Sequence, residues 1–285
     1  MMRRRELMNT GSAGRVRYSH LTMIPLEDGF QAKLSNSECH YRIDGGEWKS
    51  LPKGEYTPTI KVGQVLQFQA NAVPQSWIGI GTFTTNKRFN LEGNCMSMIF
   101  ADEADWQMSL AQHPYAFYAL FKGSKVASVS EDFLPATTMS DGCYASMFQD
   151  CTGLVNGPEL PASDIPYYGC QAMYSGCTSL RKASPMAATQ VGEYACYNMY
   201  RGCTALQEGP ALYPTSLVNG CYYQMFQQCS KLNYIKAMFI GYLGTACYAW
   251  VDGVAATGTF VKNKDATWDV TGISGVPEGW TVKTE

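Results

Sequence analysis

The chain has 285 residues, of which 46% are apolar and 16% charged, and its formal net charge is −2. Globular proteins average about 25% charged residues, so the chain is poor in charge but has the composition of a folded protein. The net charge argues against nucleic acid as a partner, and the lack of about eighteen consecutive apolar residues argues against a membrane span.

Residues 1–20 form a basic arm with five arginines and a single acid. No apolar run follows the first arginines, so we expect no secretory signal. Such an arm is usually a mobile tail, and the alternative is an anchor that docks onto a larger assembly. The candidate anchor residues are Arg3, Arg4, Arg5, Arg15 and Arg17.

Residues 21–110 contain several short segments in which apolar and polar residues alternate. The segment 41–50 reads as a β-hairpin, because Asp44-Gly45-Gly46 is a strong turn signal between alternating flanks. Further alternating segments are 59–62, 64–69, 81–85 and 88–91. Short strands at short spacing predict an antiparallel β-sandwich-like domain over 21–110.

Residues 111–254 contain an internal repeat with a period of 26 residues. Cysteines recur at Cys151, Cys177, Cys203 and Cys229. Methionines precede them by four positions, aromatic residues by three, and leucines follow by three. A fixed period with apolar columns predicts a solenoid, in which stacked coils share one core. Degenerate coils at 115–124 and near 250–254 mark its ends.

Two local patterns recur within each coil. The apolar residues of 167–176 have helical spacing and predict a short helix that stops at Gly176. The segment 180–186 carries Pro185 and is expected to be extended with irregular hydrogen bonding. Two alternating segments, 257–262 and 279–283, predict a C-terminal β cap over 255–285. Together these elements predict an α+β protein.

The repeated motif resembles the BspA-like class of leucine-rich repeats. It is seen in 147–154 (MFQDCTGL), followed by Leu-Pro-Ala at 160–162, and again in 225–232 (MFQQCSKL). The resemblance covers about residues 115–285. It implies a leucine-rich-repeat solenoid and a binding or adhesion role at bacterial surfaces, and unsecreted proteins of this kind resemble phage and prophage components.

The candidate catalytic and metal-binding residues are few. The cysteines are expected to be reduced core residues, because free cysteine behaves as a small apolar side chain. His20, His40 and His113 lie far apart and are expected to be structural. The repeat has few acids and no periodic carboxylate pair of the kind that glycoside hydrolysis requires. We therefore expect no enzyme activity, no metal and no cofactor.

Tyrosine is the most informative residue type, because fifteen of the eighteen tyrosines lie at or after Tyr115. Stacking of coils places Tyr168 beside Tyr194 and Tyr197 beside Tyr223. A charge-poor surface rich in tyrosine offers a large contact area at low entropic cost, although such phenols often only cover the structure beneath them. The candidate ligand-binding residues are Tyr144, Tyr168, Tyr194, Tyr197, Tyr222 and Tyr223.

These observations, with the resemblance, favour a non-enzymatic protein of a phage virion, made in the host cytoplasm. Its N-terminal region would contact other virion proteins, and its repeat would bind a host-surface glycan or protein. The first alternative is a bacterial cell-surface adhesin, and the second, less favoured, is a glycan-cleaving enzyme. The sequence leaves a homo-oligomer open.

Overall fold

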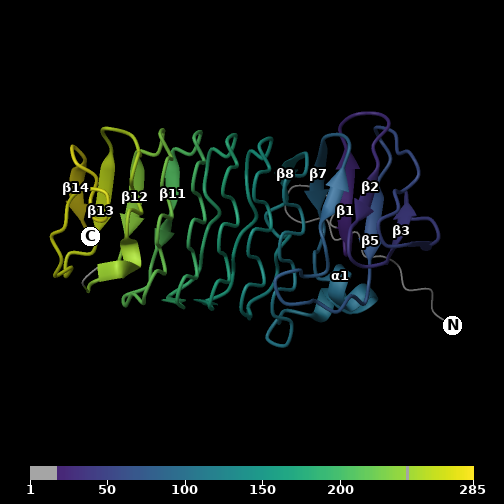
Figure 1. The fold of residues 1–285 in the computed structure, drawn as a ribbon, viewed down its shortest axis with the longest axis horizontal. Coiled ribbons are helices and arrows are strands. Elements are labelled where there is room, and N and C mark those ends of the chain that lie inside the picture. The colour runs from purple at the N-terminus through teal and green to yellow at the C-terminus, as the bar shows by residue number, and fades with distance from the viewer. Residues whose placement is uncertain (1–17, 242–243) are drawn as a thin grey trace.

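The protein is an elongated body built mostly from β-strands, with few helical residues (Figure 1). The computed structural model describes residues 18–241 and 244–285. The five arginines of the expected anchor lie outside the described residues. One cluster of buried side chains extends from Leu21 to Trp280, so the whole body shares a single core.

The N-terminal region contains two sheets. The larger is a six-stranded sheet with the order β4-β3-β5-β1-β7-β8. Its strands are β1 (Leu21–Pro25), β3 (Cys39–Ile43), β4 (Lys49–Leu51), β5 (Leu66–Gln69), β7 (Phe89–Glu92) and β8 (Val126–Val129). The smaller sheet is the antiparallel pair of β2 (Ala32–Leu34) and β6 (Phe83–Thr85). One turn of helix, α1 (Ser97–Phe100), leads into the 3-10 helix η1 (Ala101–Trp106).

The hairpin predicted at 41–50 is present. Strands β3 and β4 pair antiparallel, with His40 opposite Ser50. Asp44 and Gly45 both have positive φ angles, 52° and 70°, which a tight hairpin turn requires. The predicted turn chemistry is therefore confirmed at this position.

Strand β8 joins the N-terminal sheet to the repeat. It lies beyond residue 110 in the chain but pairs parallel with β7 at the edge of the six-stranded sheet. Sheet and core therefore continue across the position where the sequence suggests a boundary.

The C-terminal part is a β-solenoid of about five turns. Its strands are β9 (Asp164–Ile165), β10 (Gln190–Val191), β11 (Glu208–Leu212), β12 (Tyr234–Ala237), β13 (Thr259–Lys262) and β14 (Thr281–Thr284). Each pairs parallel with a strand of an adjacent coil: β9 with β10 in one pair, and β11 to β14 in one four-stranded sheet. The 3-10 helix η2 (Gly244–Cys247) lies between β12 and β13. The two strands expected near the C-terminus are thus present and extend the parallel sheet.

The short helix predicted at 167–176 is wrong, because this segment is a run of tight turns. Every second N–H group bonds within the coil, as from Gln171 to the carbonyl of Tyr168 (3.0 Å). The intervening N–H groups bond to the next coil, as from Ala172 to the carbonyl of Tyr197 (2.8 Å). Tyr168, Ala172 and Gly176 have positive φ angles, so the turn geometry recurs every four residues.

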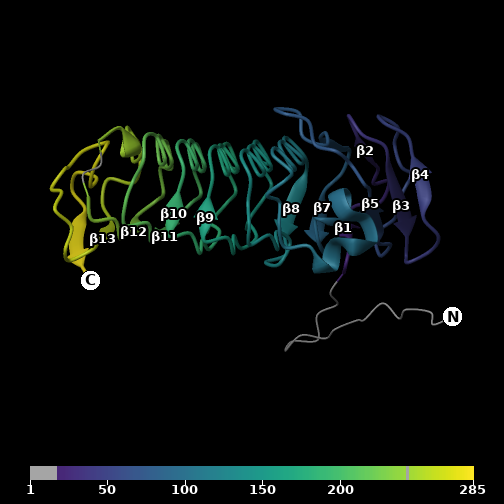
Figure 2. The same cartoon turned by 90° about the horizontal axis from the view of Figure 1, so that it is seen from below.

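The run of turns has nearly the period of a helix, which explains the mistaken prediction. Buried side chains in this coil are Cys170, Met173, Tyr174 and Cys177. Their spacing of i, i+3, i+4 and i+7 is that of an amphipathic α-helix. Periodicity alone cannot distinguish a four-residue turn repeat from a helix of 3.6 residues per turn. Figure 2 shows the turn runs of successive coils side by side along one edge of the solenoid.

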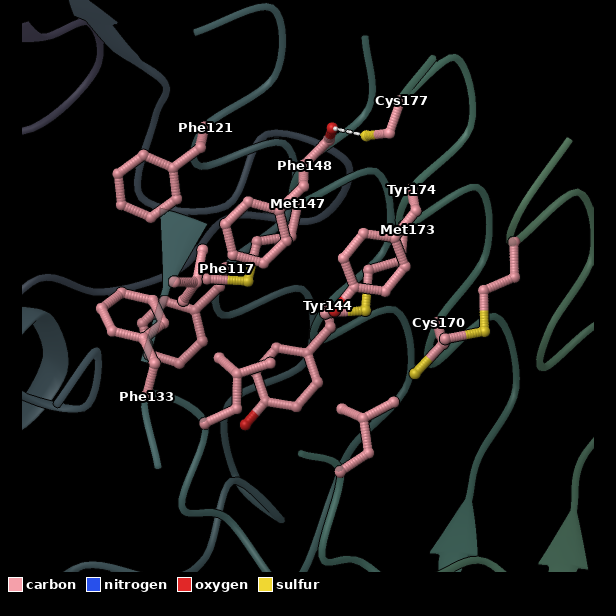
Figure 3. Packing of buried hydrophobic residues seen from close by; sticks show 14 of the residues in the cluster. Phe117, Phe121, Phe133, Tyr144, Met147, Phe148, Cys170, Met173, Tyr174 and Cys177 are labelled. Carbon is pink, nitrogen blue, oxygen red and sulfur yellow. Dashed lines mark hydrogen bonds between the residues drawn. The ribbon is translucent and has the colours of Figure 1, made fainter. Parts of the chain in front are cut away.

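The core of the solenoid contains a stack of aromatic rings, and Cys170 and Cys177 lie beside it (Figure 3). Phe121, Phe148, Tyr174 and Tyr200 lie in nearly parallel planes, with ring centroids 5.7, 5.7 and 5.3 Å apart. All eleven cysteines are free and buried, as the sequence predicts.

Candidate functional site

Nine aromatic side chains form a chain of ring contacts along the turn runs. We call this set the aromatic strip. Two are tyrosines of the first, degenerate coil, six are tyrosines of later coils, and one is a tryptophan from the N-terminal region. The members are Trp77, Tyr115, Tyr118, Tyr167, Tyr168, Tyr194, Tyr197, Tyr223 and Tyr248.

The register of the coils explains the C-terminal part of the strip. Tyr168 and Tyr194 occupy equivalent positions in adjacent coils, and their rings stack at 5.5 Å. Tyr197, Tyr223 and Tyr248 occupy a second column three residues further along, with centroid distances of 5.3 and 4.9 Å. Tyr194 connects the columns through Tyr197, 6.2 Å away. The two neighbour pairs predicted from the period are therefore confirmed.

The coil that begins at residue 142 interrupts both tyrosine columns. The positions equivalent to Tyr115 and Tyr118 in this coil are Gly142 and Ala145. A Cβ atom at Gly142 would lie 2.3 Å from the Tyr115 ring, so glycine lets that ring lie against the backbone. The indole of Trp77 contacts the tyrosines on both sides of this coil. Its centroid lies 4.6 Å from that of Tyr115 and 5.5 Å from that of Tyr168.

Trp77 belongs to a tight loop that is pressed against the first coil. The loop is closed by a bridge between Gln75 and Gly79. A Cβ atom at Gly79 would lie 2.9 Å from the carbonyl oxygen of Tyr115, so this contact requires glycine. Trp77 itself has a φ of 59°, which is strained for a bulky residue. Its side chain nevertheless stays 47% exposed.

Two phenols of the strip, those of Tyr115 and Tyr168, have pKa values above the ordinary value of tyrosine. A hydrogen bond with Tyr167, together with burial, raises the pKa of Tyr168 to about 12. Burial and the nearby charge of Asp141 raise the pKa of Tyr115. The hydroxyl of Tyr194 accepts a hydrogen bond from the Asn219 amide at 3.0 Å. The strip therefore combines apolar rings with hydroxyl groups that take part in hydrogen bonds.

The six tyrosines proposed from the sequence divide into two groups. Tyr168, Tyr194, Tyr197 and Tyr223 are partly exposed members of the strip. The assignment of the other two to a ligand-contacting surface is a mistake, because both are buried. Tyr144 is 1% exposed and stacks on Phe117 at 6.0 Å, and Tyr222 is 0% exposed. They occupy inward-facing positions of the turn run, so solvent does not reach them.

Five members of the strip were missed as candidates, and one of them, Tyr167, is the chain neighbour of the candidate Tyr168. Tyr248 follows Tyr223 by 25 residues and could have been found by allowing the period to shorten at the end of the repeat. Tyr115 and Tyr118 lie in the degenerate first coil, where the same extension would have found them. No sequence signal relates Trp77 to the repeat, since it belongs to the N-terminal region.

One histidine forms a polar contact that spacing did not predict. The Nδ1 atom of His20 lies 2.8 Å from the Ser19 hydroxyl, and its Nε2 lies 3.3 Å from an Asp102 carboxylate oxygen. Burial and the charge of Arg42 lower the pKa of His20. The imidazole is buried, whereas the Asp102 side chain is 78% exposed. We interpret this contact as a tie between the start of β1 and η1.

Within the described residues, no group of three or more histidine, cysteine or acidic side chains could hold a metal ion. No helix among them is long and apolar enough to cross a membrane. Comparisons with protein-family models, with curated proteins and with solved structures found no match for this chain. Fold and site together define a β-solenoid that carries an aromatic strip along its turn runs.

Proposed function

We propose that this protein is a non-enzymatic binding protein and that the aromatic strip is its ligand-contacting surface. The observation that carries the proposal is the unbroken chain of ring contacts from Trp77 to Tyr248, in which Tyr248 remains 51% exposed. Soluble proteins usually bury aromatic side chains or expose them singly, and a continuous row of partly exposed rings is typical of an interaction site. Tyrosine is suited to such contacts because its ring is large and rigid and its tip is polar.

We propose a host-surface glycan or protein as the ligand, with the N-terminal region attached to a larger particle. The BspA-like resemblance supports this assignment to a phage virion, and the same resemblance supports a bacterial surface adhesin as the alternative. It also supports a leucine-rich-repeat identity for the solenoid, whereas the short alternating segments of residues 21–110 support a sandwich-like arrangement there. The turn runs and short parallel strands are compatible with that repeat class.

Binding is tested with the full chain and the double variant Tyr168→Ala/Tyr197→Ala on intact host cells. We expect the double variant to lose most of its binding while its thermal unfolding midpoint changes little, because both side chains are partly exposed. The matched control is Tyr56→Ala, since Tyr56 is 46% exposed and lies outside the strip. Equal binding by the double variant and the wild type would reject the strip as the site.

Location distinguishes the two biological settings. An antibody against the folded protein would be used to probe density-purified phage particles and washed cell envelopes. Signal in particles supports the virion component. Signal confined to envelopes supports the adhesin instead.

A further inference from the structure

The aromatic strip is composed of two tyrosine groups that do not contact each other directly at the coil beginning with Gly142. Tyr115 and Tyr118 lie on the N-terminal side of this coil, and the other six tyrosines lie on its C-terminal side. Trp77 contacts both groups, at 6.1 Å from Tyr118 and 5.5 Å from Tyr168. The indole therefore occupies the place where the repeat lacks an aromatic side chain.

The loop that carries Trp77 is built to hold the indole there. Its bridge between Gln75 and Gly79, the close approach of Gly79 to the first coil and the strained φ of Trp77 all fix one orientation. Backbone strain at an exposed bulky residue has a cost that folding stability alone does not explain, and such strain is common at binding sites. The N-terminal region thus contributes directly to the surface formed by the repeat.

We propose that Trp77 is a ligand-contacting residue and that the strip binds an unbranched, neutral polysaccharide lying along the solenoid axis. This inference rests on the proposed function of the strip. Adjacent coils are about 4.8 Å apart where their strands pair, and the tyrosine rings of adjacent coils are 4.9 to 5.5 Å apart. This spacing is close to the length of one pyranose unit in an extended chain, so successive sugars meet successive rings.

The chemistry of the strip favours sugar over an apolar peptide or an anion. The C–H groups of a pyranose ring pack against the exposed carbon atoms of the tyrosine rings, and its hydroxyl groups exchange hydrogen bonds with phenols and with Asn219. Exposed acids, Asp141 and Glu193, stand at equivalent positions beside the strip. Their charges disfavour a polyanionic glycan.

The experiment measures the affinity of the full chain for neutral linear oligosaccharides of increasing length, using cello-, chito- and malto-oligosaccharide series. For at least one series, we expect the wild-type affinity to rise with length until the strip is filled. In Trp77→Ala the rise should stop at shorter chains, and the longest members should bind about tenfold more weakly. Trp77→Tyr keeps an aromatic ring and should restore most of the affinity.

Trp106→Ala is the matched control, because Trp106 is 75% exposed and contacts no ring of the strip. Unfolding midpoints of all variants report any loss of fold. If Trp77→Ala binds every length like Trp106→Ala while Tyr168→Ala weakens binding, the role of Trp77 is overturned and the strip remains a binding site. If the wild type binds host cells but no oligosaccharide, the ligand class is overturned. If the wild type binds neither, the proposed function fails as well.

Discussion

Single side chains satisfy backbone groups between the coils. The thiol of Cys177 donates to the carbonyl oxygen of Phe148 at 3.1 Å, and Cys151, Cys203 and Cys229 make the equivalent bond to the preceding coil. The Phe148 carbonyl oxygen also accepts the backbone N–H of Cys151 at 3.1 Å, so the thiol uses its second lone pair for a weak bond between coils. Cysteine therefore fills space in the core and also supplies a donor, which explains its recurrence better than apolar volume alone.

The burial of these thiols predicts slow chemical labelling. Thiolate is the reactive form, and burial raises the pKa of Cys151 and Cys229 to about 12. We expect iodoacetamide to label few repeat cysteines in native buffer at neutral pH and all of them in denaturant, as counted by mass spectrometry. Thr178→Cys places a thiol at the exposed neighbour of Cys177 and serves as the rapidly labelled control. Rapid labelling of the repeat cysteines in the native wild type would contradict their burial.

The leucine column makes a second prediction at the residue scale. Leu180 is 0% exposed, and its truncation to alanine leaves a cavity in the shared core. Leu180→Ala should lower the free energy of unfolding by about 2–5 kcal/mol, measured by urea denaturation. Val155→Ala in the neighbouring coil is the control, because Val155 is 44% exposed and its change should be small. If both substitutions lowered the free energy of unfolding equally, Leu180 would not belong to the core.

The turn run is the element that distinguishes this solenoid. Its geometry requires positive φ angles at every fourth residue, and glycine supplies them in several coils, as at Gly123, Gly142 and Gly220. At Gly142 and Gly220 a tyrosine ring of the preceding coil also lies over the glycine. These two positions therefore need glycine for space as well as for conformation.

A pair of glycines separates these two requirements. Gly123 and Gly142 have similar φ angles of 67° and 61°, but only Gly142 has a ring against it. Gly123→Ala should cost ~1–2 kcal/mol from the left-handed conformation alone. Gly142→Ala should cost more in the same denaturation assay, because the Tyr115 ring must move. Gly142→Ala should also weaken binding at the strip, whereas Gly123→Ala should not. Equal losses of stability in the two variants would contradict a role for ring packing at Gly142.

At the scale of the whole molecule, one core runs through both the N-terminal sheets and the solenoid. Strand β8 belongs to the repeat and to the six-stranded sheet at once. We expect the described body to unfold in a single cooperative transition, since no gap in the core separates its ends.

The many buried thiols make the free energy of unfolding sensitive to alkaline pH. Unfolded thiols release protons above about pH 9.0, whereas burial holds the pKa of Cys143 and Cys151 near 12. The unfolded state then binds fewer protons than the native state, so the free energy of unfolding falls as pH rises through this window. Below pH 9.0 the contribution is fully present. The midpoint of urea denaturation, measured from neutral pH upward, should therefore fall above about pH 9.0. A midpoint that does not change with pH would contradict this expectation.

The sequence by itself determined the period, the columns and the neighbours across coils. These follow from a local pattern, because coils stacked in register repeat the same environment every 26 residues. Cys177 and Leu180 could be assigned to the core in this way, and Tyr168 could be placed beside Tyr194. The hairpin at Asp44-Gly45 was also predictable, since turn chemistry is local.

Only the tertiary structure decided the rest. Helical spacing at 167–176 fits a four-residue turn repeat equally well, and the choice depends on hydrogen bonds to the next coil. Tyr144 and Tyr222 are an exception, because the 26-residue period places them in the column of the buried Cys170 and so already indicates that they face the core. Trp77 joins the strip through contacts with residues distant in the chain. No periodic pattern encodes such contacts, because they arise where the N-terminal loop packs on the first coil.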